Sequence, residues 1–276
     1  MKHELRLFFV ALQFLTRVPV PRWVGFEPAW LQGCLRHFPL VGACIGAWAA
    51  AVLWAALQLW PPAVAAVIST LATVWLTGAF HEDGLADTFD ALGGAASRER
   101  ALEIMKDSRI GSYGAVALVL LLLLKVSVLA ALAGAVGPLQ AGVALVWAHA
   151  VSRAAPVWLV ARLRYAGDAE HAKAKPLATQ ITRAGTAVAG VWVVLISAAA
   201  AVLMSALGTT SLRAVPLAPL AVPLALLAVA LATWACARWL RRRLGGFTGD
   251  TLGATQQLAE AAALLAWLAT VGAVDP

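Results

Sequence analysis

Residues 112–134 of the chain read SYGAVALVLLLLLKVSVLAALAG, an apolar run with Lys125 as its only charged residue. A helix needs about 20 predominantly apolar residues to cross the hydrocarbon core of a bilayer. This run is therefore predicted to be a transmembrane helix. The composition points the same way, because 62% of the 276 residues are hydrophobic and 13% are charged, whereas a soluble domain has roughly 25% charged residues.

Similar apolar stretches lie on both sides of this run. The N-terminal segment 1–37 begins with a short apolar run after Lys2 and Arg6, and no cleavage site follows. It is predicted to be an uncleaved amphipathic helix at the membrane surface. The expected fold is all-α: a polytopic membrane helix bundle of about seven transmembrane helices plus this interfacial helix, with residues 1–276 as a single integral-membrane domain. The predicted spans are residues 38–60, 62–80, 112–134, 138–160, 186–207, 215–237 and 256–274.

The hydrophilic gaps between the spans alternate in character. Four long gaps, 1–37, 81–111, 161–185 and 238–255, hold most of the 21 lysines and arginines, and the others are short turns. Because basic residues are retained on the cytoplasmic side of a membrane, these four segments are predicted to face the cytoplasm. Segment 81–111 is accordingly expected to be a cytoplasmic metal and phosphate loop.

Charge and cysteine content exclude two other classes of protein. The formal net charge of +7 is explained by juxtamembrane basic residues near anionic lipid headgroups, so nucleic-acid binding is rejected. Cys34, Cys44 and Cys236 are too few and too scattered for a disulfide framework or a zinc site.

The segment 81–90, HEDGLADTFD, carries the most specific chemical signal. On a helix, Asp83, Asp87 and Asp90 fall at i, i+4 and i+7 and form one stripe. Three aligned carboxylates repel each other unless a cation lies among them. Mg²⁺ takes oxygen ligands and is often shared with substrate phosphates. The stripe therefore predicts a Mg²⁺ site with these three aspartates as ligands.

Neighbouring residues refine this hypothesis. Glu82 points about 100° away from Asp83 on the helix, and Gly84 is interpreted as an interruption that favours a metal site. His81 has an ordinary pKa of about 6.5, which suits a general base near neutral pH. The alternative, an acidic helix end exposed to solvent, stays open because negative charge is favoured near helix N-termini.

Polar residues inside the predicted spans need partners, because each is costly in lipid. Lys125 could snorkel, face the bundle interior or contact an anion. His149 and Arg153 share one helix face at i, i+4, so Arg153 is a candidate phosphate ligand, with a packing role equally open. Glu260 lies slightly inside the last predicted span and also requires a partner.

Two glycine-rich segments at span boundaries resemble anion sites. Residues 106–114 read KDSRIGSYG and residues 241–253 read RRRLGGFTGDTLG. Glycines let backbone N–H groups approach phosphate, and a helix N-terminus adds a favourable dipole. Lys106, Arg109 and Asp250 are therefore candidate residues of a substrate-phosphate site. Both segments could instead only end helices.

Taken in order, these motifs resemble those of the cobalamin synthase family, also called adenosylcobinamide-GDP ribazoletransferase. The resemblance runs nearly from end to end, and its most specific part is His-x-Asp-Gly-Leu-Ala-Asp-x-x-Asp. The matching segments are FLTRVP at 14–19, HFPLVG at 37–42, HEDGLADTFD at 81–90, MKDSRIGSYG at 105–114, Ser152-Arg153, and GDTLGA at 249–254 with Glu260.

The resemblance implies the last stage of nucleotide-loop assembly in cobalamin synthesis. Adenosylcobinamide-GDP and α-ribazole, or its 5′-phosphate, would give adenosylcobalamin, or its 5′-phosphate, and GMP. The resemblance also implies Mg²⁺ as cofactor and a place in the lipid bilayer of the bacterial inner (plasma) membrane. A homo-oligomer and association with other corrinoid-pathway enzymes both stay open, as does the choice of general base. The expected catalytic residues are His81, Asp83, Asp87 and Asp90, and the expected phosphate-binding residues are Lys106, Arg109, Arg153 and Asp250.

Two other functions compete with this interpretation. A CDP-alcohol phosphotransferase also uses spaced aspartates at the end of a span, but here Ala86 is followed by Asp87 rather than arginine, and the later Gly-x-x-x-Asp-x-x-x-Asp spacing is absent. A cation-coupled transporter would have carboxylates buried near mid-membrane, whereas the acids here are expected to gather at one interface.

Overall fold

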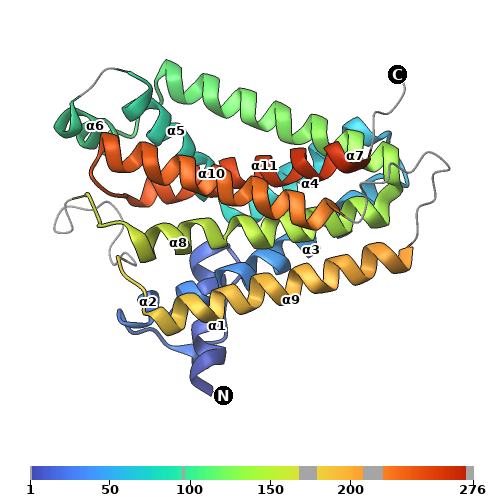
Figure 1. Ribbon diagram of the computed structural model, residues 1–276, viewed down its shortest axis with the longest axis horizontal. Helices are drawn as coiled ribbons and strands as arrows, with labels where there is room; N and C mark the ends of the chain where they lie inside the picture. The colour runs from blue at the N-terminus through green and yellow to red at the C-terminus, as the bar shows by residue number, and fades with distance from the viewer. Residues whose placement is uncertain (1, 95–96, 168–178, 208–219, 272–276) are drawn as a thin grey trace.

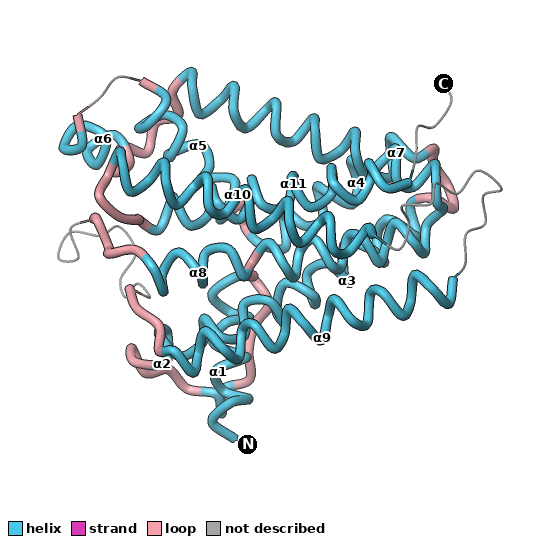
Figure 2. Tube along the Cα trace, viewed as in Figure 1, coloured by secondary structure: helices cyan, strands magenta, loops and turns pink. Residues whose placement is uncertain are grey.

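The computed structural model describes residues 2–94, 97–167, 179–207 and 220–271. Within these residues every regular element is a helix, and no strand occurs (Figure 1, Figure 2). An isolated bridge pairs Tyr165 with Phe247. The all-α prediction is therefore confirmed.

The N-terminal segment folds as predicted into an amphipathic helix, α1 (Lys2–Leu15). Leu7, Val10 and Leu15 are buried on one face, at the i, i+3 and i+8 spacing of an amphipathic helix. This face packs against α2 (Trp30–Cys34) and α3 (Phe38–Ala56). The 3₁₀ turns η1 (Arg22–Val24) and η2 (Leu35–His37) complete the segment.

Long helices build the rest of the bundle. After α3, the chain forms α4 (Pro62–Thr77), α5 (Phe80–Gly93) and the short α6 (Arg98–Ile104). It continues through α7 (Ser112–Ser152), α8 (Ala154–Arg162), α9 (Arg183–Leu207), α10 (Ala221–Arg243) and α11 (Gly249–Val271).

Helix α7 contains the turn predicted between two spans. Gly137 has a non-helical conformation with φ 78°, and Pro138 follows it. A positive φ suits glycine, and proline lacks the N–H that a continuous helix requires. The chain turns back here, so the two arms of α7 run in opposite directions (Figure 1).

The count of seven spans is not confirmed. Within the described part of the chain, four helical stretches can cross a membrane by length and composition, or five if α4 and α5 form one bent span. Helix α11 is not among them, since Gln256, Gln257 and Glu260 interrupt its apolar sequence. Parts of two predicted spans, residues 215–219 and 272–274, lie outside the described residues. The structure thus supports a multi-pass helix bundle, but it does not confirm that the number of membrane spans is seven.

Arginine side chains connect three of the four charged segments between the predicted spans, at one end of the bundle. Arg98 donates to the carbonyls of Leu244 (2.8 Å) and Ala166 (3.1 Å). Arg243 donates to the carbonyls of Leu92 (3.2 Å) and Gly94 (3.1 Å). The predicted gaps 81–111, 161–185 and 238–255 therefore meet, although residues 168–178 lie outside the described part.

Cysteine labelling should distinguish the two ends of the bundle. In a background with Cys34, Cys44 and Cys236 replaced by alanine, an impermeant thiol reagent added to intact cells should label Gln58→Cys and not Glu99→Cys. Gln58 lies in the short α3–α4 turn, and Glu99 is exposed on α6 at the basic end. Labelling of Glu99→Cys from outside would show that the orientation in the membrane is opposite to the predicted one.

Candidate active site

Helix α5 carries the aspartate motif and begins at a sharp corner. Gly78 ends α4 with φ 68°, and Ala79 follows with φ 58°, the one left-handed non-glycine residue in the described chain. The helices on either side are bent by 89°. As a result α5 leaves the line of α4 and packs against α7 and α11.

The two faces of α5 have different surroundings. Asp83 is exposed and Asp87 and Asp90 are half-buried, while Glu82 is only 7% exposed. The predicted divergence of Glu82 from Asp83 is confirmed. The interpretation of Gly84 as an interruption was wrong, because the residue is helical. A Cβ there would lie 2.7 Å from the Asp250 carbonyl oxygen, so glycine permits close packing of α5 on α11.

Asp90 connects α5 to the predicted phosphate loop. Its carboxylate accepts backbone N–H bonds from Gly111 (2.6 Å) and Gly114 (2.8 Å), at the start of α7. These N–H groups have no partner within their own helix, so the carboxylate caps α7 and complements its dipole. The sequence motifs 81–90 and 106–114 are thereby brought together.

The predicted cations of this loop are accessible. Lys106 and Arg109 are both exposed. Arg109 is paired with Asp107 at 2.6 Å, and this hydrogen bond, followed by the charge of Asp107, raises the pKa of Arg109. The backbone of Asp250, at the start of α11, packs on Gly84 and so brings the third motif to α5.

The aspartates of α5 meet part of the needs of a Mg²⁺ ion. Among the described residues, no group of three or more His, Cys, Asp or Glu side chains is arranged to hold a metal ion. Mg²⁺ is often held by one or two carboxylates, with water and substrate phosphates as its other ligands. Asp83 and Asp87, one helical turn apart, fit that mode of binding. Asp90 already accepts two backbone N–H bonds.

A buried ion cluster centred on Glu260 lies in the bundle interior, next to the buried face of α5. Its carboxylate is 2.6 Å from the Lys125 ammonium, 3.0 Å from His149 Nδ1 and 3.8 Å from the Arg153 guanidinium. It also accepts a hydrogen bond from Gln256 at 2.7 Å. These side chains are all buried. The partners that Lys125 and Glu260 required are therefore each other.

Gln257 links this cluster to α5. Lys125 donates to Gln257 Oε1 (3.0 Å), and Gln257 Nε2 donates to Glu82 Oε1 (3.0 Å). Sequence reasoning missed Glu82, Gln256 and Gln257 as members of a network. The sequence did contain a signal for such a network, because two adjacent amide side chains, Gln256 and Gln257, lie in the predicted apolar span 256–274.

Two predicted site residues lie on this buried side. His81 is 4% exposed, and Arg153 is 2% exposed and bonded to the His149 carbonyl at 2.9 Å. The i, i+4 pairing of His149 with Arg153 is thus observed. The structure does not bring Arg153 together with Lys106 and Arg109, and its role as a phosphate ligand stays a prediction.

Arg17 is a further cation that sequence reasoning did not select. Its backbone N–H donates to the Leu76 carbonyl (2.8 Å), and its Nε lies 2.8 Å from where a Cβ on Gly78 would be. Phe14 packs against Phe80 with ring centroids 5.4 Å apart. The exposed guanidinium therefore lies over the corner where α5 begins. The available signal was the motif FLTRVP at residues 14–19.

Fold and site together define a multi-pass helical membrane protein whose polar chemistry is organised around one aspartate-bearing helix. The family model described as cobalamin-5-phosphate synthase matches residues 7–268. The chain belongs to this family.

Curated relatives agree with the family assignment. The chain is 59% identical to adenosylcobinamide-GDP ribazoletransferase of Leptothrix cholodnii, over 98% of this chain and 97% of the relative. It is 47% identical to the protein of that name from Albidiferax ferrireducens, over 95% and 97%, and 43% identical to that from Shewanella amazonensis, over 94% and 93%. No solved structure matches.

Removing the central carboxylate should destabilise the bundle. Glu260→Gln is expected to lower the free energy of unfolding by about 3–5 kcal/mol, because Lys125 and Arg153 would be left buried without compensation. Thermal denaturation of the purified protein in detergent measures this change. Glu103→Gln is the control, since Glu103 is 66% exposed and paired only with exposed Arg100. An unchanged midpoint for Glu260→Gln would contradict the structural role of the cluster.

Proposed function

We propose that this chain is an adenosylcobinamide-GDP ribazoletransferase. A ribose hydroxyl of α-ribazole, or of its 5′-phosphate, attacks the phosphorus on the cobinamide side of the pyrophosphate. A new P–O bond forms, the bond to the guanylyl phosphate breaks, the hydroxyl proton passes to a base, and GMP leaves. The products are adenosylcobalamin, or its 5′-phosphate, and GMP.

The observation that carries this proposal is the convergence of the family motifs on α5. The loop 106–114 meets α5 through Asp90, and the start of α11 meets it at Gly84. The names of the relatives supply the substrates. The exposed face of α5 supplies carboxylates where a phosphate can reach them.

Each accessible residue has a role in this proposal. Lys106 and Arg109 neutralise the pyrophosphate from one side, and Arg17 does so from the corner before α5. Guanidinium groups suit this task because their paired N–H donors match phosphate oxygens. A carboxylate of α5 is the preferred base, because these side chains are at least partly exposed whereas His81 is buried.

Asp83 and Asp87 would hold a Mg²⁺ ion, with Asp90 holding the adjacent loop in place. When bound, Mg²⁺ offsets the charge that develops on the phosphate oxygens. Positioning and electrostatic stabilisation account for most catalysis in phosphoryl transfer. The chain's own contribution is therefore to fix these carboxylates and cations around one bound pyrophosphate.

The proposed setting is the bacterial inner membrane with the site facing the cytoplasm. Its support is the meeting of basic segments at one end of the bundle and the retention of basic loops on the cytoplasmic side. The loop carrying Lys106 and Arg109 belongs to one of these segments.

No observation favours either of the two competing functions, a CDP-alcohol phosphotransferase or a cation-coupled transporter. A cation-coupled transporter would use buried carboxylates, and Glu82 and Glu260 are buried in the bundle. Glu260, however, is compensated by Lys125 and Arg153, so it serves as a fixed counter-ion. For Glu260, this removes the feature that would favour a cation-coupled transporter.

Asp83→Asn should separate catalysis from stability. The change keeps the shape of the side chain, removes one exposed charge and is expected to reduce GMP release by about 10²-fold or more, with an unchanged denaturation midpoint. It should also raise the Mg²⁺ concentration needed for half-maximal turnover. Activity equal to that of wild type would show that Asp83 is not part of the active site.

Two variants serve as comparisons. Glu103→Gln removes an exposed charge on α6 and should retain full turnover. Asp90→Asn should lower both turnover and the denaturation midpoint, because its amide cannot accept hydrogen bonds from both Gly111 and Gly114.

A further inference from the structure

Tyr113 is an exposed aromatic residue beside the aspartate helix. It is 56% exposed and lies in the first turn of α7, between two glycines of the loop. These glycines, Gly111 and Gly114, both donate their backbone N–H groups to the Asp90 carboxylate. The position of Tyr113 is therefore fixed relative to the carboxylates of α5.

The ring of Tyr113 rests on the last residue of α5. A Cβ on Gly93 would lie 2.8 Å from Tyr113 Cδ1 and 2.9 Å from its Cγ, so glycine lets the ring approach the backbone closely. Arg243 of α10 holds this end of α5 by donating to the carbonyls of Leu92 and Gly94. One edge of the ring is thus packed on a fixed helix end, and more than half of the residue stays accessible.

The distance along α5 suits one nucleoside. Gly93 lies six residues beyond Asp87, which corresponds to about 9 Å of helix rise. A base joined to one ribose is comparable in length, so a nucleoside with its base on Tyr113 can place its ribose beside Asp87. Ile110 of the same loop is 59% exposed, which adds apolar surface to that of the ring.

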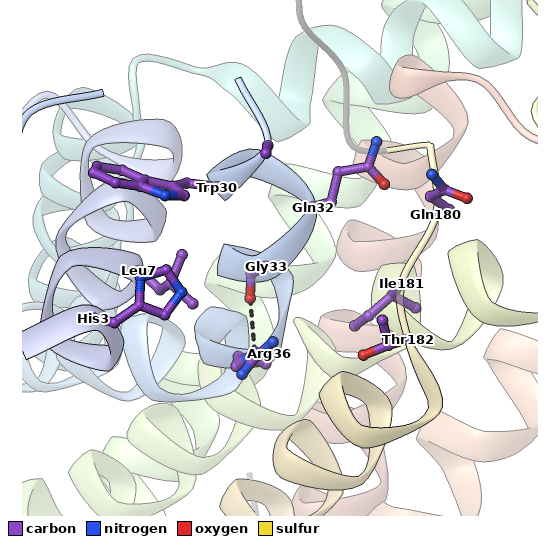
Figure 3. A pocket seen from close by; sticks show the side chains of 10 residues that line it. His3, Leu7, Trp30, Gln32, Gly33, Arg36, Gln180, Ile181 and Thr182 are labelled. Atoms are coloured by element: carbon purple, nitrogen blue, oxygen red, sulfur yellow. Dashed lines mark hydrogen bonds between the residues drawn. The ribbon is translucent and has the colours of Figure 1, made fainter. Parts of the chain in front are cut away.

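A cavity of about 660 Å³ lies elsewhere, between the N-terminal segment and the start of α9 (Figure 3). Its lining residue Arg36 is already paired with Glu4 at 3.0 Å. None of its lining residues belongs to α5 or to the loop 106–114, so it shares no residue with the site. A base whose ribose reacts at α5 needs a surface on that helix.

We propose that Tyr113 stacks on the benzimidazole base of α-ribazole, or of its 5′-phosphate, and so binds the acceptor substrate. This inference rests on the proposed function. The benzimidazole has no N–H once it carries ribose, so stacking and apolar contact are its main means of recognition. Guanine has several hydrogen-bonding groups along one edge, and an aromatic face with Ile110 beside it in the loop supplies no partners for them.

Fluorine NMR of the purified full chain tests this contact directly. Tyr113 and Tyr165 are the two tyrosines of the sequence, so 3-fluorotyrosine incorporated into a Tyr165→Phe background reports on Tyr113 alone. Tyr165→Phe keeps the ring that packs against Phe247. α-Ribazole phosphate should move the resonance of Tyr113 upfield, as expected for a stacked ring, whereas GMP and inorganic phosphate should leave it in place.

Steady-state kinetics measure what the ring contributes. Tyr113→Leu should raise the KM for α-ribazole phosphate by about tenfold or more, the loss expected for one stacked base, and leave the KM for adenosylcobinamide-GDP unchanged. Tyr113→Phe keeps the ring and should behave like wild type. Trp54→Leu is the control, since Trp54 is 51% exposed on α3, near the α3–α4 turn, and should also behave like wild type.

Three results would overturn the assignment. One is a resonance of Tyr113 that does not move with α-ribazole phosphate, and another is a resonance that moves with GMP alone, which would show a guanine site. The third is an equal KM in Tyr113→Leu and Trp54→Leu, which would show that Tyr113 is only an aromatic anchor at the membrane interface. An absence of turnover in wild type would instead refute the proposed function, and the resonance would still report whether the base binds at Tyr113.

Discussion

The need to compensate buried charge governs this structure. Lys125 and Arg153 lie in a helix bundle where an isolated cation is very unfavourable, and both depend on Glu260 of α11. Through Gln257 the same cluster reaches Glu82 of α5. The polar groups of three helices therefore bond to one another, and these contacts hold the helix that carries the aspartates in place.

One consequence is a helix with two distinct roles. Glu82 ties α5 to the interior, while Asp83, the next residue, is exposed on the protein surface. The 100° step between successive helical residues is enough to separate anchoring from chemistry. Asp90 then holds the loop of Lys106 and Arg109. The reactive groups are thus positioned by contacts that do not themselves involve the substrate, which is how preorganised sites are generally built.

Helical periodicity could be read from the sequence, whereas tertiary contacts could not. Helical spacing correctly separated Glu82 from Asp83 and aligned His149 with Arg153. Hydropathy found the turn at Gly137 but not the number of spans, because Gln256, Gln257 and Glu260 make α11 polar along a face that is satisfied only by other helices. Gly84 looked like an interruption because the approach of Asp250 is not encoded locally. The importance of Arg17 likewise depends on a corner far along the chain, at Gly78.

We infer that this bundle transfers the adenosylcobinamide-phosphate group of adenosylcobinamide-GDP to α-ribazole or its 5′-phosphate, with GMP as the leaving group. The most direct measurement uses the purified chain with Mg²⁺, α-ribazole phosphate and adenosylcobinamide-GDP labelled with ³²P at the cobinamide-side phosphate. We expect all label to enter the corrinoid product and unlabelled GMP to be released in equal amount. Label recovered in a guanine nucleotide, or no release of GMP, would contradict this claim.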